Sequence, residues 1–192
     1  MRRIFNFEVG TTLLLFREDY AAQIVEFALS LPLLVVFVVG IFDFTGALSL
    51  KQKLTNAARE AARVAAADPA NDLNNTATTP VSVSDAFQVA DNYLISEKVN
   101  DCGLSANMTP TPSGLTWTSA ALTGCPGGTG LTLTVNRGCI TKANGIDVVN
   151  TCVTLQYPYT WRFNSVIKVL VPTASYAKTI YITTAATAFN EN

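Results

Sequence analysis

The chain has 192 residues, of which 49% are hydrophobic and 14% charged, and it carries a formal net charge of −1 with no histidine. This charge provides no basic surface of the kind that binds nucleic acid, so a nucleic-acid partner is not expected. Without histidine, Ser-His-Asp and Cys-His arrangements are excluded. The sequence also has no Gly-x-Ser-x-Gly elbow and no Ca²⁺-loop spacing. It therefore predicts no enzyme, no metal site and no cofactor.

The first element along the chain is a long apolar run. No charge occurs from Phe27 to Phe42, and the chain stays weakly polar from Asp43 to Leu50. A helix needs roughly 20 residues to cross a bilayer, and a core helix of a soluble protein would normally keep a polar stripe. The run therefore predicts a membrane span over about residues 24–50. A cleaved signal peptide fits poorly, because the preceding stretch mixes acidic with basic residues.

The composition after the span is strongly helical, so the helix is expected to run unbroken from about Gln23 to Ala67, where Asp68-Pro69 ends it. Pro32 removes one backbone hydrogen bond, and a kink is expected there. Beyond the membrane, small residues recur at helical spacing and predict a face that packs closely against the protein's own domain. This face consists of Leu54, Ala58, Ala61 and Ala65.

The remainder predicts a helix followed by a sheet. A second helix is expected from Ser84 to about Val99, with Ser84 as its N-cap. The hydrophobic period then changes to two, which is typical of half-exposed strands. Three segments show it: 131–137, 148–157 and 176–185. The predicted fold class is α+β, with one long membrane helix leading into a small domain that contains a second helix and three or four antiparallel strands.

Four cysteines lie in the soluble part, and none forms a Cys-x-x-Cys pair. Two disulfides in an oxidising compartment explain them better than a zinc site does, whereas the charges flanking the span do not orient the protein. Cys139 and Cys152 lie on either side of an Asn-Gly turn, which favours their pairing. Cys102 and Cys125 are then left by elimination, although four cysteines allow three connectivities.

Glu26 is the lone acidic residue at the amino-terminal edge of the span. An ionised side chain there is costly unless a cation meets it, so it indicates a functional role. The partner that it suggests is the free amino terminus of the same chain, of another copy or of a relative. The alternative is that Glu26 merely lies in the headgroup region, favoured by the positive end of the helix dipole.

Three stretches resemble the amino-terminal region of TadE-like proteins. They are YAAQIVEFALSLPLL at 20–34, GIFDF at 40–44 and LTNAAREAAR at 54–63. These proteins are minor pilins, or pseudopilins, of the tight adherence system, which builds the Tad (Flp, type IVc) pilus. The resemblance extends more weakly to residues 153–159 and to the last strand.

The resemblance implies several residue roles. A prepilin peptidase would cleave between Ala21 and Ala22, although the family usually has glycine where Ala21 stands. The new ammonium group at Ala22 would then lie one turn from Glu26, which would set the axial register of bundled helices. Asp43 corresponds to a frequently acidic position at the outer interface, and Pro32 could assist helix assembly. The implied partners are the major pilin, other minor pilins, the prepilin peptidase and the inner-membrane pilus platform.

Residues 1–21 are therefore expected to be a cytoplasmic leader, 22–67 the long helix and 68–192 an extracytoplasmic domain. The expected location is the inner membrane, with a single span in contact with lipid, a periplasmic carboxy-terminal domain and incorporation into an extracellular pilus as a further possibility. The expected function is pilus assembly for surface adhesion. The alternative is an uncleaved single-span anchor whose outer domain binds a ligand or an envelope partner.

Overall fold

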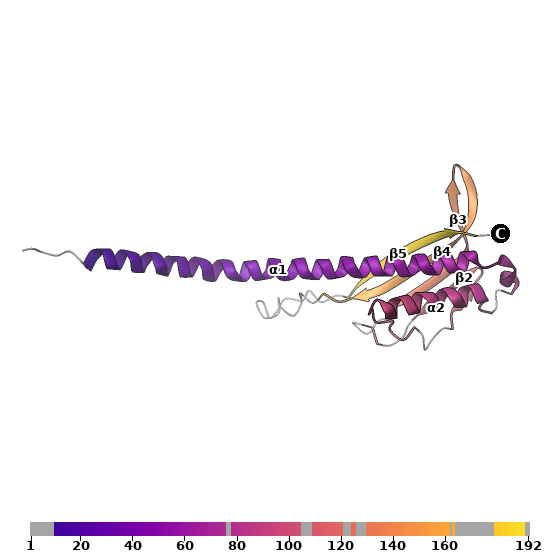
Figure 1. Cartoon of the computed structure of the whole chain (residues 1–192), viewed down its shortest axis with the longest axis horizontal. Coiled ribbons are helices and arrows are strands. Elements are labelled where there is room, and N and C mark those ends of the chain that lie inside the picture. The colour runs from indigo at the N-terminus through magenta and orange to yellow at the C-terminus, as the bar shows by residue number, and fades with distance from the viewer. Residues whose placement is uncertain are drawn as a thin grey trace, which may run out of the picture.

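The computed structural model describes residues 10–75, 78–104, 109–120, 124–125, 130–161, 163 and 179–190. One long helix dominates the molecule, and a small domain of helix and sheet gathers around its carboxy-terminal part (Figure 1). The amino-terminal part of the helix extends away from that domain. This arrangement confirms the predicted α+β class with a long helix leading into a small domain.

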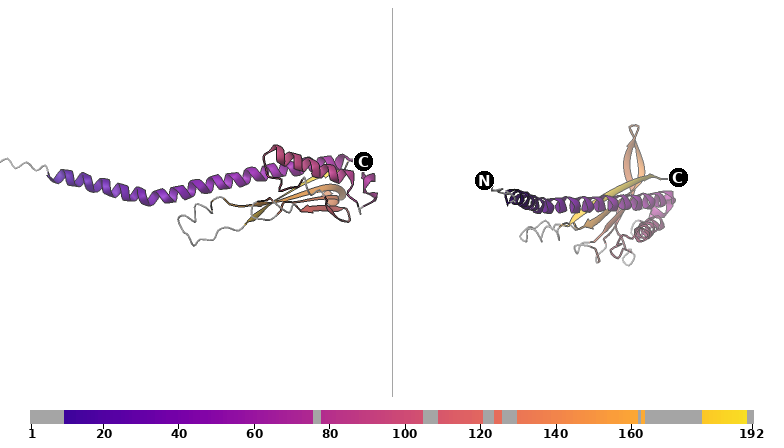
Figure 2. Two further views of the ribbon diagram at one scale, coloured as in Figure 1. Left: turned by 90° about the horizontal axis from the view of Figure 1, so that it is seen from below. Right: turned by 60° about the vertical axis from the view of Figure 1, so that its left-hand side comes forward.

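Helix α1 spans Gly10–Ala67, a continuous 58 residues. It begins well before the predicted start near Gln23, because the segment between contains no proline and no internal glycine that would stop helix propagation. It ends as expected at Asp68-Pro69. Figure 2 shows a change of direction within its amino-terminal half, which contains Pro32.

A short 3₁₀ helix, η1 (Ala70–Asn74), leads into α2 (Val81–Ser96). The prediction that Ser84 caps α2 is wrong, because the helix begins at Val81, after Pro80. The cap comes from outside the helix. A carboxylate oxygen of Asp72 on η1 accepts a hydrogen bond from the backbone amide of Ser82 at 3.0 Å. This contact satisfies one of the amides that a helix start leaves without an intrahelical partner.

The sheet is an antiparallel meander in the order β1-β2-β3-β4-β5. The strands are β1 (Thr111–Ser113), β2 (Thr116–Ala120), β3 (Thr132–Ala143), β4 (Ile146–Tyr159) and β5 (Ile180–Phe189). The last three correspond to the predicted strands, although residues 176–178 of the third prediction lie outside the described residues. Strands β1 and β2 were not predicted, so the sheet has five strands instead of three or four.

The core lies between one face of the sheet and the two helices. Alternate residues of β4, including Val153 and Leu155, are buried against α1, and the small-residue face of α1 is fully buried at Leu54, Ala58, Ala61 and Ala65. Phe87 and Leu94 bring α2 into the same cluster. Both helices lie on the same side of the sheet (Figure 2). Small side chains on α1 allow this close approach, as the spacing predicted.

Two disulfides join elements of the domain. Cys139 and Cys152 bridge β3 and β4, with Cα atoms 5.9 Å apart. Cys102, which follows α2, pairs with Cys125, with Cα atoms 4.7 Å apart. These are the two pairings that the sequence favoured. The first lies at the base of the β3–β4 hairpin, which stands out from the rest of the domain in Figure 1.

Candidate functional site

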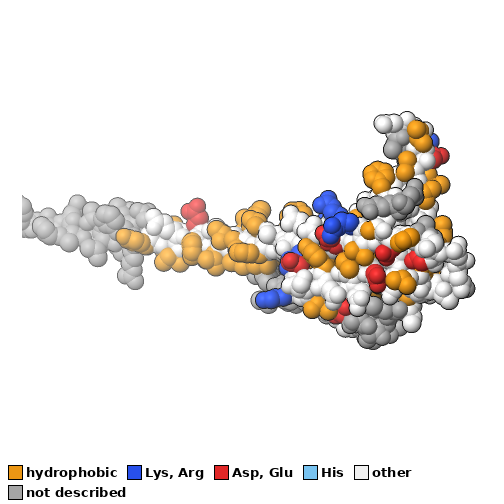
Figure 3. All heavy atoms as spheres, turned by 45° about the vertical axis from the view of Figure 1, so that its right-hand side comes forward, with side chains coloured by type: hydrophobic (Ala, Val, Ile, Leu, Met, Phe, Trp, Pro, Cys, Tyr) orange, Lys and Arg blue, Asp and Glu red, His pale blue; other side chains and the backbone are white. Residues whose placement is uncertain are grey.

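The exposed part of α1 is the most unusual surface of the molecule. Its most apolar 18-residue window has a mean hydropathy of 2.6 and is 0% buried, and it is the one helix among the described residues that is long and apolar enough to cross a membrane. Leu29 is 75% exposed and Phe42 is 73% exposed. Figure 3 shows these apolar side chains as an orange rod projecting from the domain. A surface of this kind requires an apolar environment.

Glu26 interrupts this apolar surface. Its side chain is exposed, and within the part of the chain that the structure describes it forms no ion pair or hydrogen bond. Ala22 lies four residues earlier and is also exposed, so the two positions share one helix face. The Ala21–Ala22 bond lies inside the continuous helix α1. A carboxylate on an exposed apolar helix is costly in an apolar environment, so it favours pairing with a cation from another segment or another chain.

Asp43 has a different environment from Glu26, because it is only 5% exposed. The hydroxyl of Tyr159, at the end of β4, lies 3.1 Å from both the backbone carbonyl and the Oδ1 atom of Asp43 and donates to them. The backbone amide of Phe163 donates to Oδ2 at 2.7 Å. Asp43 therefore joins the helix to the base of the domain, a role that its position in the sequence did not indicate.

This junction marks the point where the domain begins to contact α1. From Ala22 to Asp43 the helix rises about 32 Å at 1.5 Å per residue, which matches a hydrocarbon core of about 30 Å. Beyond Asp43 the domain begins to contact the helix, and Leu54 is already fully buried. The part of the helix that is free of domain contacts therefore ends near Asp43, and the membrane span over about residues 24–50 stays a prediction.

Gly46 lies beside the same contact. A Cβ atom added at Gly46 would lie 3.4 Å from the hydroxyl oxygen of Tyr159. The ring of Tyr159 in turn packs edge-on against Trp161, with ring centroids 5.3 Å apart. The tyrosine hydroxyl therefore lies within van der Waals distance of the position that a side chain at residue 46 would occupy.

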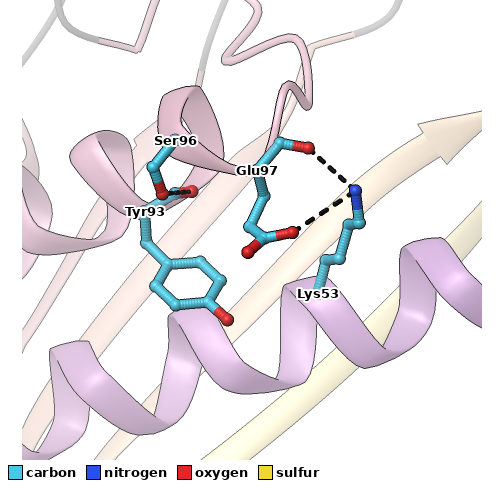
Figure 4. Close-up of polar contacts among 4 residues, drawn as sticks. All are labelled: Lys53, Tyr93, Ser96 and Glu97. Atoms are coloured by element: carbon cyan, nitrogen blue, oxygen red, sulfur yellow. Dashed lines mark hydrogen bonds and ion pairs between the residues drawn. The ribbon is translucent and has the colours of Figure 1, made fainter.

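A second contact fixes the end of α2 against α1. Lys53 of α1 donates to the backbone carbonyl of Glu97 at 2.8 Å and pairs with its carboxylate at 3.4 Å (Figure 4). The next residue, Lys98, has a left-handed backbone with φ of 56°. Amides of Lys98 and Val99 donate to the carbonyls of Ile95 and Leu94, which is the hydrogen-bond pattern of a Schellman motif.

Sequence reasoning missed two buried charged groups. Arg137 on β3 is 1% exposed, and one of its terminal nitrogens donates to the backbone carbonyl of Asp68 at 2.9 Å. Burial lowers the pKa of Arg137, while Asp72 and Asp68 act in the opposite direction. Asp91 on α2 is 4% exposed, and burial raises its pKa, with Asp101 adding to the effect. Because alternate residues of a strand share one face, Arg137 lies on the core side of β3 with Val135. This alternation could have predicted the burial of Arg137.

The predicted residues thus fall into separate groups. Glu26 and Ala22 lie on the exposed helix, Pro32 lies inside it, and Asp43 lies at its junction with the domain. The four cysteines form the two disulfides of the domain. No group of three or more His, Cys, Asp or Glu residues with metal-binding geometry occurs among the residues that the structure describes.

An exposed apolar helix that continues into a small α+β domain defines a single-pass, membrane-anchored protein with a pilin-like architecture. Residues 21–63 match the family model described as TadE-like protein, which covers most of the stretches on which the resemblance rested. This match supports a TadE-like protein of the Tad pilus system through the amino-terminal helix, the part of the chain that the family model covers. No curated protein and no solved structure matches the chain.

This family gives the protein a membrane-associated function related to the Tad pilus and to other components of that pilus. TadE-like pilins are a structural, non-enzymatic family. The match ends at Arg63, so the second helix and the sheet lie outside it, as does the weaker resemblance at residues 153–159.

Proposed function

We propose that the protein is a minor pilin or pseudopilin that takes part in assembling a Tad (Flp, type IVc) pilus for surface adhesion. The observation that carries this proposal is the exposed carboxylate of Glu26, which immediately precedes an uncharged helical stretch from Phe27 to Phe42. The family match over the same helix supports it. The domain would lie in the periplasm, where its two disulfides can form and persist.

The mechanism depends on a new amino terminus. Cleavage between Ala21 and Ala22 by a prepilin peptidase would create an α-ammonium one helical turn from Glu26. When helices gather side by side, the carboxylate of one chain meets the ammonium of the same chain or a neighbour. A desolvated pair of this kind contributes mainly axial register, because desolvation offsets much of its attraction. Such a helix would pack with the major pilin and other minor pilins above the inner-membrane platform.

A second candidate function is an uncleaved membrane anchor that presents a ligand-binding or partner-binding domain. Two observations favour it: alanine stands at position 21, and α1 continues without interruption from Gly10 through the expected cleavage point. In this case residues 1–21 remain attached and Glu26 lies in the headgroup region, stabilised by its position on the helix.

Mass spectrometry of the protein purified from its native membrane separates the two functions. A mature chain that begins at Ala22 supports the minor pilin, whereas a chain that retains residues 1–21 supports the anchor. Deletion of the gene provides the functional readout. Loss of pili from the deletion strain, restored by the wild-type gene, supports the assembly role, and normal piliation would contradict it.

A further inference from the structure

A cavity lies where the exposed helix meets the domain. Its volume is about 520 Å³, and it is bounded by one face of α1, by the connection that follows α2 and by the end of β4. The residues from α1 include Val39, Phe42 and Asp43, which span the end of the exposed apolar stretch. The cavity is therefore located at the boundary between hydrocarbon and headgroups once α1 crosses a bilayer.

The lining of this cavity is amphiphilic and carries both signs of charge. Val39 and Phe42 give it an apolar wall that continues onto the exposed helix. The lining includes an acidic residue of α1, Asp43, and a basic residue of the connection that follows α2, Lys98. Oδ1 of Asp43 accepts from the Tyr159 hydroxyl and Oδ2 from the Phe163 amide, and each oxygen retains capacity for a second hydrogen bond.

The backbone holds Lys98 in place at this wall. Its φ of 56° lies in the left-handed region, where glycine is preferred and a side chain costs free energy. The surrounding turn is fixed by the Schellman hydrogen bonds and by the contact of Lys53 with Glu97 (Figure 4). Lys98 therefore occupies a backbone conformation that suits glycine, and it lines the cavity.

We propose that this cavity binds the headgroup of a zwitterionic phospholipid with a primary amine, drawn from the leaflet next to the domain. Lys98 pairs with the phosphate, Asp43 accepts from the ammonium, and the acyl chains follow the apolar wall onto α1. An anionic lipid without the amine fits less well, because Asp43 repels it. A second copy's apolar helix also fits poorly, because it would cover Asp43 and Lys98 without supplying an opposite charge to either. The inference requires membrane anchoring but not pilus assembly.

Native mass spectrometry of the full-length protein in detergent micelles tests this site. The protein is titrated with dioleoyl phosphatidylethanolamine and, separately, with dioleoyl phosphatidylglycerol. The wild type is expected to retain the ethanolamine lipid preferentially. Lys98→Gln is expected to weaken that binding about tenfold, the effect of one charge-assisted hydrogen bond. Lys51→Gln, an exposed cation on α1 that does not line the cavity, is the matched control and is expected to bind like the wild type.

Lys98→Gly separates binding from folding. Glycine removes the charge but relieves the left-handed strain, so this variant is expected to lose the lipid while melting at a higher temperature than the wild type. Wild-type lipid affinity in either Lys98 variant would overturn the proposal. Equal binding of the two lipids would overturn it as well. So would a photoreactive residue at Val99 that cross-links to another polypeptide and not to lipid. None of these outcomes bears on pilus assembly.

Discussion

The hydroxyl of Tyr159 and the carboxylate of Asp43 form a hydrogen bond between residues 116 positions apart, at the point where the exposed helix meets the domain. Asp43 is almost fully buried, so its lost hydration is replaced by this hydroxyl and by the amide of Phe163. The contact joins the last turn of the exposed helix to the end of β4. It therefore fixes the position on α1 at which the domain begins.

Replacing Tyr159 by phenylalanine removes this hydroxyl and retains the ring. We expect the free energy of unfolding to fall by about 1–2 kcal/mol, because one buried carboxylate oxygen loses its donor. The measurement is chemical denaturation of the full chain in detergent, followed by tryptophan fluorescence. Tyr181→Phe, on the half-exposed outer face of β5, is the matched control and is expected to change stability little. Equal stability of the two variants would show that the contact contributes nothing.

Gly46 provides an independent test of the same contact. A Cβ atom added at residue 46 would lie 3.4 Å from the tyrosine hydroxyl, in van der Waals contact, so we expect the larger, branched side chain of Gly46→Leu to crowd Tyr159 and weaken its contact with Asp43. We expect a lower midpoint of thermal unfolding. The same substitution at Gly40 meets nothing within 4 Å and gains about 1 kcal/mol in helix propensity. A Gly46→Leu protein as stable as Gly40→Leu would contradict the geometry at this junction.

The small side chains on the buried face of α1 predict that a larger side chain there will lower the stability of the domain. Ala61 is 0% exposed between α2 and the sheet, and Ala61→Leu is expected to destabilise the domain by about 1–3 kcal/mol through overpacking. Ala67→Leu makes the same change at an exposed position on the same helix. Thermal unfolding followed by circular dichroism compares the two. Tolerance of leucine at both positions would mean that the helix and domain do not pack as described.

Asp91 gives the domain a specific dependence on pH. Burial raises the pKa of Asp91 above its ordinary value of 3.8, and the charge of Asp101 adds to this rise. The folded protein therefore holds a proton that the unfolded chain releases, and Asp91 reduces stability as pH increases from about 4 through the folded pKa. The penalty is absent below that window and fully present above it.

Asp91→Asn removes this penalty while keeping a similar shape. We expect the variant to melt at a higher temperature than the wild type at pH 7, and the difference to shrink as pH approaches 4. Melting temperatures at several pH values provide the measurement. Asp147→Asn, exposed on the β3–β4 hairpin, is the control and should follow the wild type at every pH. A variant that is less stable than the wild type at pH 7 would reverse the assigned sign.

Local pattern predicted some of these features and could not predict others. Helical spacing identified the buried face at Ala58 and Ala61, and the Asn-Gly turn indicated the Cys139–Cys152 pairing, because both signals are contained within a few residues. Strands β1 and β2 have only three and five residues, and Pro112 weakens the strand pattern of β1, so no periodicity distinguished them. The predicted cap of α2 was wrong because the capping oxygen belongs to Asp72, which lies ten residues before the amide of Ser82 that it binds.

The residues of the candidate site also differ in how far the local sequence could predict them. Glu26 was found because one charge in an apolar run is visible in the sequence alone. The environment of Asp43 depends on Tyr159 and on a domain contact that no local pattern records. The left-handed backbone of Lys98 was equally hidden, since lysine does not indicate such a conformation. Residues whose roles depend on distant partners therefore required the structure.

We propose that the carboxylate of Glu26 takes part in assembling helices into a pilus. The most direct test of this proposal is Glu26→Gln at the native gene, with sheared pili quantified and membrane levels of the protein measured by immunoblot. Glu60→Gln, on the exposed surface of the same helix beyond the span, is the matched control. We predict normal membrane levels for both variants and loss of pili for Glu26→Gln alone. Wild-type pilus output from the Glu26→Gln strain would contradict the account.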